Sequence, residues 1–149
     1  MEEDPIALGL PHREPFVFVD RVISRIAGEA AVAEKTFAAA TPFFAGHFPG
    51  APLVPGVILA EALAQTAGLA AGQAGASFRL AALKTMKFPA AAGPDELIQL
   101  EARRIATVGV LWQFEGQARV GDRIVAEGVI VLSQHEAPGA AGEGTSPAA

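Results

Sequence analysis

The segment from Val57 to Gly75, VILAEALAQTAGLAAGQAG, constrains the fold more than any other part of the chain. It contains no proline and consists mainly of alanine and leucine, so it predicts one helix. Because this helix is apolar on nearly all sides, it should be buried from most directions rather than lie on a surface. Gly68, Gly72 and Gly75 narrow one side of it, and we expect them to permit close packing against strands rather than to contact a ligand.

Six extended segments flank the helix, two before it and four after it. The alternation is clearest where Trp112, Phe114 and Ala118 share one face. Turn residues at Ala27-Gly28 and Gly121-Asp122 join neighbouring segments as hairpins. A single buried helix among such strands needs an antiparallel sheet wrapped around it, which predicts an α+β fold. The six segments are residues 16–25, 29–37, 80–88, 96–106, 110–120 and 123–132.

The length of 149 residues suits one domain, which we place at residues 1–135. The tail over residues 136–149 is made of small and polar residues and should be disordered. The chain is 51% hydrophobic and only 18% charged, which is poor in charge for a soluble monomer. We therefore expect part of its exterior to be covered by another subunit.

Composition excludes several classes of function. The net charge of −5 argues against nucleic acid as a partner. There are no cysteines, so disulfides, thiolate nucleophiles and cysteine-based metal sites are ruled out. The histidines His12, His47 and His135 lie far apart without metal-ligand spacing, so no metal is expected.

A membrane-spanning helix is not expected either. The longest apolar stretch, Ala51 to Ala76, is interrupted by Pro55, Glu61 and Gln65. The acidic N-terminus does not look like a signal peptide, since it lacks a basic region. We expect a cytoplasmic protein without membrane insertion.

The candidate site is FFAGHFPGAPLVPGVILAEALAQ, residues 43–65, where His47 lies on backbone shaped by glycine and proline. Glu61 follows inside the helix, and Gln65, four residues later, shares its face and can hydrogen-bond to it. Gly56 precedes the helix, where free N–H groups can hold a carbonyl oxygen. Each residue alone is compatible with a structural role. Together they offer a base, an acid and a polarised carbonyl, which suits proton abstraction beside a carbonyl with loss of a leaving group.

These residues resemble a known family. GHFPGAPLVPGV…AEALAQ, from Gly46 to Gln65, is similar to the signature of the FabZ-type 3-hydroxyacyl-acyl-carrier-protein dehydratases, which have the hotdog fold. LPHREPFVFVDRV, from Leu10 to Val22, resembles the opening block of the same family, and Met86–Pro89 is a weaker match to its strand after the helix.

The resemblance implies a sheet continuous across a homodimer, with members often forming trimers of dimers, and no cofactor. It implies that His47 of one subunit takes a proton from C2 of a 3-hydroxyacyl thioester on acyl carrier protein. Glu61 of the partner would protonate or orient the departing hydroxyl, and Gly56 N–H would polarise the carbonyl. The substrate-binding positions implied are Gly56, Gln65, Phe48 and Val54. Glutamate rather than aspartate in the helix implies dehydration to the trans-2-enoyl product without isomerisation.

The sequence also departs from the family pattern. Residues 38–41 read AAAT where the family has Asn and Glu, and there is no tyrosine to gate a tunnel. These departures leave open a non-catalytic hotdog partner subunit or acyl-binding module, and an acyl thioesterase is a further alternative. We expect His12 to be structural and Arg13 to suit a buried or interface pair with Asp20. Candidate cations for carrier docking, each equally compatible with a solvated structural role, are Lys84, Lys87, Arg103 and Arg104.

Overall fold

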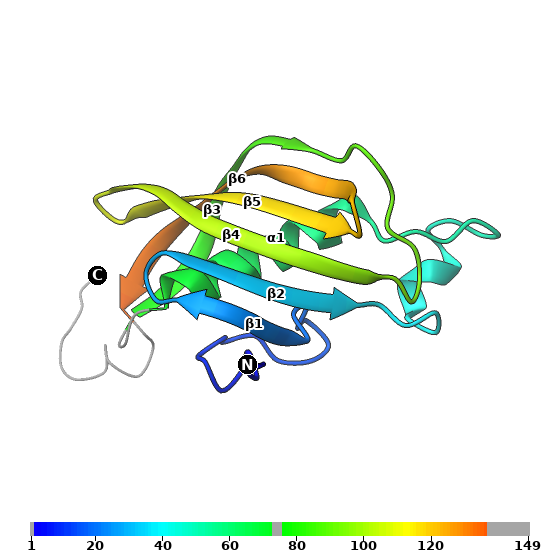
Figure 1. Cartoon of the computed structure of the whole chain (residues 1–149), viewed down its shortest axis with the longest axis horizontal. Coiled ribbons are helices and arrows are strands. Elements are labelled where there is room, and N and C mark those ends of the chain that lie inside the picture. Colours follow the sequence, from blue (N-terminus) through cyan, green and yellow to red (C-terminus); the bar gives the residue numbers. More distant parts are fainter. Residues whose placement is uncertain (1, 73–75, 137–149) are drawn as a thin grey trace, which may run out of the picture.

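A computed structural model describes residues 2–72 and 76–136, in which one long helix lies against a six-stranded sheet (Figure 1). Two strands precede the helix and four follow it, as the sequence predicts. The elements are β1 (Arg21–Ile26), β2 (Ala30–Thr36), the short 3-10 helix η1 (Pro42–Ala45), α1 (Gly56–Ala71), β3 (Ala76–Lys87), β4 (Leu97–Val108), β5 (Leu111–Val120) and β6 (Arg123–Glu136).

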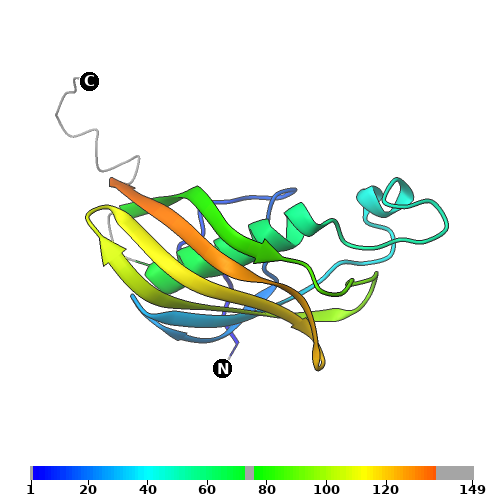
Figure 2. The same ribbon diagram turned by 90° about the horizontal axis from the view of Figure 1, so that it is seen from above.

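The sheet is antiparallel throughout, in the order β1-β2-β4-β5-β6-β3, so β1 and β3 are its edges. It curves around α1, which lies along its inner face (Figure 2). Gly121 takes a φ of 59° in the turn between β5 and β6, a conformation that glycine adopts without strain. The predicted α+β architecture is therefore confirmed.

The core lies between the inner face of the sheet and α1. In β5 the buried positions alternate as predicted, with Trp112, Phe114 and Ala118 facing inward. Burying one such large apolar side chain stabilises the fold by about 1.5–3 kcal/mol. The largest fully buried apolar side chains include Leu59, Leu63, Ile98, Leu100, Phe114 and Ile130.

Helix α1 ends earlier than the sequence predicts, at Ala71 rather than Gly75. Arg25 closes its C-terminus, since Nε donates to the Leu69 carbonyl (2.7 Å) and Nη2 donates to the Gly72 carbonyl (3.4 Å). A cation here also complements the helix dipole. A Cβ on Gly72 would overlap the guanidinium of Arg25, so only glycine leaves room for this cap. The predicted helical residue Gly75 lies outside the described residues.

The first predicted strand is wrong over residues 16–20, because β1 begins only at Arg21. The FVFV pattern suits a strand, but the backbone here bonds to the helix instead of to the sheet. Gln65 on α1 accepts from the Phe18 N–H (2.8 Å) and donates to the Phe16 carbonyl (3.0 Å). At the other end of the chain, β6 extends to Glu136, and the rest of the predicted disordered tail lies outside the described residues.

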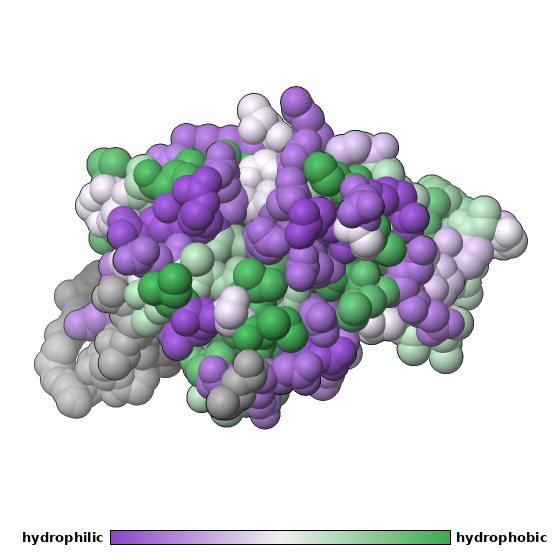
Figure 3. All heavy atoms as spheres, in the orientation of Figure 1, coloured by the Kyte–Doolittle hydropathy of each residue, from purple (hydrophilic) through white to green (hydrophobic). Residues whose placement is uncertain are grey.

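The outer face of the sheet is mainly hydrophilic, with separate apolar patches (Figure 3). Two ion pairs cross its strands, Arg103 with Glu115 and Arg119 with Glu101. Within the described residues, no helix has the length and hydropathy needed to cross a bilayer.

Candidate active site

A cavity of about 730 Å³ runs along the side of α1 that the sheet leaves open. Its walls are residues 8–12 with Phe16, one face of α1 from Glu61 to Gly72, residues 76–80 of β3, and single residues of β1 and β6. The lining is mostly apolar with a few polar groups, which is typical of a small-molecule site.

Glu61 supplies a carboxylate to this cavity from the second turn of α1. Its side chain is 20% exposed, so it is held close to the protein while still accessible. Gln65 Nε2 donates to Glu61 Oε2 (3.1 Å), the hydrogen bond expected from their four-residue spacing. The carboxylate therefore has a defined orientation within one subunit.

Gln65 does more than the sequence indicates. Its side chain is 1% exposed and makes three hydrogen bonds, to Glu61 and to the backbone of Phe16 and Phe18. It thereby fastens the N-terminal segment to α1 and closes one wall of the cavity. This buried amide therefore holds the N-terminal segment in place and orients the carboxyl group of Glu61.

His12 is the site residue that sequence reasoning missed. Its Nε2 lies 3.5 Å from Glu61 Oε2, and its ring stacks on Phe16 with centroids 6.0 Å apart. Its Nδ1 is buried and meets no hydrogen-bond partner within the described residues. Arg13 and Asp20 do not pair within the subunit: Arg13 donates to backbone carbonyls, and Asp20 binds Lys35 and the Thr36 N–H.

His47 lies in the loop that follows η1, in the part of the molecule that projects beyond the sheet (Figure 1). Its Nδ1 is 3.2 Å from the Leu53 carbonyl oxygen, and its ring stacks on Phe48 with centroids 4.0 Å apart. A carbonyl oxygen can only accept, so the neutral ring carries its proton on Nδ1. This leaves Nε2 with a free lone pair, the form that a general base needs.

The N-terminus of α1 lies close in sequence to this loop. Pro55 caps the helix without a side-chain hydrogen bond, and within the described residues neither Gly56 N–H nor Val57 N–H meets an acceptor. The ring of Phe88 lies 3.2 Å from where a Cβ on Gly56 would be. A larger residue than glycine at this position would therefore require the Phe88 ring to move.

The predicted site residues fall into two groups. Glu61 and Gln65 line the cavity, whereas His47 and Gly56 are not part of its lining. Val54 is 2% exposed and belongs to the core, while Phe48 is 51% exposed beside His47. One subunit thus places the predicted acid and its supporting amide in the cavity, whereas the predicted base is not part of the cavity lining.

Three further lining residues escaped the sequence reasoning. Arg25 lies where the cavity reaches the C-terminus of α1, because it donates to the Leu69 carbonyl, and Arg79 belongs to the stretch of β3 that lines the cavity. Gly68 also lines the cavity, and a Cβ there would meet nothing within 4 Å, so the expectation that it packs against strands is wrong. These positions are far apart in sequence and meet only in the folded chain, so no local sequence pattern predicts that they share a cavity.

The architecture is that of the hotdog proteins. The chain superposes on a component of the dehydratase heterocomplex ApeI:P from Xenorhabdus doucetiae with a TM-score of 0.75 and 19% identity, covering 89% of this chain and 91% of that one. It also superposes on the fluoroacetyl-CoA-specific thioesterase FlK with a TM-score of 0.61 and 13% identity, covering 74% and 88% of the two chains. These likenesses establish the fold alone.

Sequence comparison goes further. Residues 10–129 match the family model of the FabA-like domain, and the chain belongs to this family. Two relatives share the name 3-hydroxyacyl-[acyl-carrier-protein] dehydratase FabZ. The protein from Lawsonia intracellularis is 39% identical over 83% of this chain and 86% of its own length. The one from Thiobacillus denitrificans is 33% identical over 93% of this chain and 100% of its own length.

Proposed function

We propose that this protein dehydrates 3-hydroxyacyl thioesters of acyl carrier protein to the trans-2-enoyl thioesters, without isomerisation, in fatty acid or related acyl-chain biosynthesis. The observation that carries the proposal is Glu61, whose oriented carboxyl group lies at the wall of a mostly apolar cavity. The relatives named FabZ support the substrate class. Acyl carrier protein as partner and a cytoplasmic location belong to the same proposal.

The residues can carry a balanced elimination. His47 Nε2 takes the proton from C2 while the thioester carbonyl oxygen accepts a hydrogen bond from Gly56 N–H. The C2–H electron pair forms the C2–C3 double bond, and the C3–O bond breaks. Glu61, protonated at the start, gives its proton to the departing hydroxyl, which leaves as water. Transfer of the proton from His47 back to Glu61 through solvent restores the enzyme.

The acid and base are proposed to meet across a homodimer. Three observations support this: His47 does not line its own subunit's cavity, β3 is an unpaired edge, and Leu80 and Leu83 on β3 are 44% and 41% exposed. An edge strand with exposed apolar side chains is a ready partner for a second copy. Pairing two β3 strands would make one continuous sheet and cover both cavities. Assembly of three such dimers is the proposed higher state.

Mixing two inactive variants tests this arrangement. His47→Ala and Glu61→Gln, denatured and refolded together in equal amounts, form half mixed dimers, each with one intact site. The mixture should recover about a quarter of the wild-type rate of enoyl formation, as two-fold symmetry dictates. Recovery of no activity from properly mixed dimers would place both residues in one subunit's site.

The product of the reaction distinguishes a thioesterase from a dehydratase. One 3-hydroxyacyl carrier-protein substrate is followed for free thiol and for enoyl absorbance in the same reaction. We expect enoyl formation without thiol release, and the reverse would overturn the dehydratase proposal. Activity that appears only beside a second hotdog chain would instead favour the partner-subunit alternative.

A further inference from the structure

We propose that Arg25 limits the length of the acyl chain that the cavity accepts, because its guanidinium group is fixed where the cavity reaches the C-terminus of α1. The inference rests on the proposed function, since it names a residue that selects among substrates of the same site. It concerns the part of the cavity where no bond of the substrate is made or broken.

The cavity follows one face of α1. The helix positions that line it recur every three or four residues, which is the spacing of a single helix face. They are Glu61, Ala64, Gln65, Gly68, Leu69 and, at the C-cap, Gly72. Glu61 is the first of them, so an acyl chain whose 3-hydroxyl lies at Glu61 extends along the cavity toward Gly72.

The separation of Glu61 and Arg25 can be expressed in carbon atoms. Leu69, whose carbonyl accepts from Arg25 Nε (2.7 Å), lies eight residues after Glu61, which corresponds to about 12 Å along the helix axis. An extended hydrocarbon with C–C bonds of about 1.5 Å advances about 1.3 Å per carbon. About nine carbons therefore span the two levels, and a chain with its C3 at Glu61 reaches the guanidinium at about twelve carbons in total.

The wall between these levels suits a hydrocarbon. Leu132 of β6 is paired with Leu80 of β3, and both line the cavity together with Phe78. Gly68 leaves the helix side open, because no atom lies within 4 Å of the position its Cβ would take. Each carbon buried along this stretch should raise the affinity about fourfold, the value of transferring one CH₂ group out of water.

The half-buried Arg25 is held in place by the end of the helix. Besides its bond to the Leu69 carbonyl, its Nη2 donates to the Gly72 carbonyl (3.4 Å). The turn that follows β1 is fastened to the same helix end, because Gly28 N–H donates to the Ala70 carbonyl (2.7 Å). Displacing the guanidinium would deprive carbonyls at the helix C-terminus of their donor and would remove a cation that complements the helix dipole.

A hydrocarbon that reached this guanidinium would displace water from a charged group and offer it no hydrogen bond in return. Burial of a charge without a partner is costly, so carbons beyond the level of Arg25 should add no affinity. The gain per carbon should therefore stop at about twelve carbons.

Binding of unreactive ligands tests the limit without any turnover. S-alkyl N-acetylcysteamine thioethers with alkyl chains of about eight to sixteen carbons are measured by displacement of the fluorescent dye ANS. Wild-type affinity should rise about fourfold per carbon and level off at about twelve carbons. Arg25→Met, which is similar in length but uncharged, should move this break by about two carbons or more, since the cost of burying the charge is gone. Arg25→Lys keeps the charge and should keep the break.

Arg21→Met is the matched control, because Arg21 lies on the same strand but does not line the cavity, and it should behave as wild type. Arg25→Gln also removes the charge while its amide can still donate to the helix end, so it makes the same test if Arg25→Met does not fold. A wild-type series without a break, or the same break in the wild type and in the folded uncharged variants, would overturn the proposal.

Turnover separates this inference from the proposed function. For 3-hydroxyacyl carrier-protein substrates, wild-type kcat/KM should fall about tenfold when two carbons are added to the longest chain that fits, and Arg25→Met should remove most of that fall. Dehydration of every length without a break in binding would overturn the limit set by Arg25 and leave the proposed function standing. A break in binding without dehydration of any substrate would overturn the proposed function and leave the limit standing.

Discussion

The two candidate catalytic side chains sit in regions of opposite character. Glu61 lies on the central helix, within contact of His12 and Gln65, and Gln65 is itself bound to two backbone groups. His47 lies on a projecting loop where its polar contact is the carbonyl of Leu53, six residues away in the same loop. The predicted acid is therefore held by contacts from several elements of the subunit, whereas the side chain of the predicted base contacts its own loop.

This contrast shows that different parts of the subunit position the two candidate catalytic side chains. The subunit's hydrophobic core positions the carboxylate, because α1 cannot move without disturbing that core. The loop around His47 is anchored at its end, where Val54 N–H donates to the Ala92 carbonyl (2.8 Å). Phe48 in this loop is 51% exposed, and Val57, the second residue of α1, is 75% exposed. The variants below ask how far the two regions are independent.

The largest effect is expected from the two chemical groups themselves. His47→Gln and Glu61→Gln should each lower kcat by about 10²–10⁴, the contribution of a positioned acid or base. Because His47 lies outside the core, its variant should keep the wild-type melting temperature. Turnover of 3-hydroxyacyl carrier-protein substrate and thermal unfolding are measured together.

His135→Gln is the control for these variants, since His135 contacts Ser133 and does not line the cavity. It should retain full activity. A His47→Gln protein with near wild-type kcat would show that the projecting loop supplies no base.

The next effect is on stability, and it belongs to the Glu61 region alone. Gln65→Leu would leave the Phe18 N–H and the Phe16 carbonyl without their partner, at a cost of about 1–3 kcal/mol for each group that stays buried. It should also lower activity, because the carboxylate of Glu61 loses its donor. Urea unfolding measures the first effect and initial rates the second.

Thr66→Val is the matched control, because the buried Thr66 hydroxyl bonds only within the helix, to the Ala62 carbonyl (2.8 Å). Its unfolding free energy should change much less than that of Gln65→Leu. Equal unfolding midpoints for the two variants would mean that the N-terminal segment does not depend on Gln65.

The same contacts explain which helices and strands could be predicted from the sequence and which could not. Apolar periodicity and turn residues located one helix and six strands, because these signals lie within short stretches of chain. The FVFV segment was mistaken for a strand because its hydrogen bonds go to Gln65, almost fifty residues away. The end of α1 was placed too late because its cap comes from Arg25 on another element.

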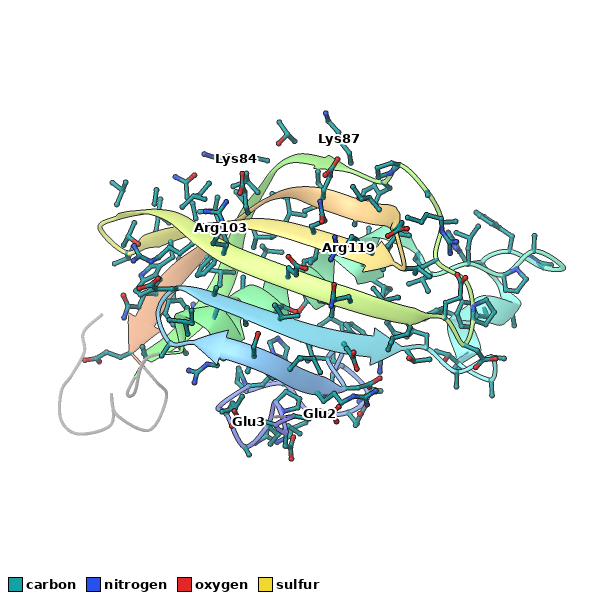
Figure 4. The ribbon with its side chains drawn as sticks, viewed as in Figure 1. Glu2, Glu3, Lys84, Lys87, Arg103 and Arg119 are labelled. Atoms are coloured by element: carbon teal, nitrogen blue, oxygen red, sulfur yellow. The ribbon has the colours of Figure 1, made fainter. Side chains whose placement is uncertain are left out.

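The candidate site divides in the same way. Glu61 and Gln65 could be paired from their spacing, since helical geometry fixes that contact. His12 could not, because its approach to Glu61 depends on where Gln65 holds the N-terminal segment. Arg103 and Arg104, taken as candidate docking cations, bind Glu115 and the Gly28 carbonyl, whereas Lys84 and Lys87 lie along the β3 edge of the outer face (Figure 4).

A smaller change in activity is expected when the neighbour of Glu61 is altered. His12→Phe keeps an aromatic ring to stack on Phe16 but removes the nitrogen that lies 3.5 Å from Glu61. We expect kcat to fall about threefold, the size of a partly exposed polar contact, with KM little changed. Steady-state kinetics separate the two parameters. If His12→Phe matches the wild type, the ring acts only through packing.

The smallest effect is on stability, and it concerns the turn that anchors the end of the His47 loop. Glu96 accepts from the Gly93 N–H and pairs with Arg123, and these contacts lower the pKa of its carboxyl below the usual value. Arg123 also donates to the Ala91 carbonyl, so the pair braces the turn that receives Val54.

A lowered pKa in the folded protein means that this carboxylate stabilises the fold above its ordinary pKa and loses that contribution as the pH falls through the folded-state pKa. Glu96→Gln should therefore cost about 0.5 kcal/mol at neutral pH, since solvent screens a pair with side chains 44% and 36% exposed. The difference should vanish in acid. Unfolding midpoints across pH measure it, with Glu115→Gln on the outer face as control. Faster hydrogen exchange at Val54 N–H in Glu96→Gln alone would show that the loop carrying His47 depends on this brace, and unchanged exchange would show that the loop is anchored independently of it.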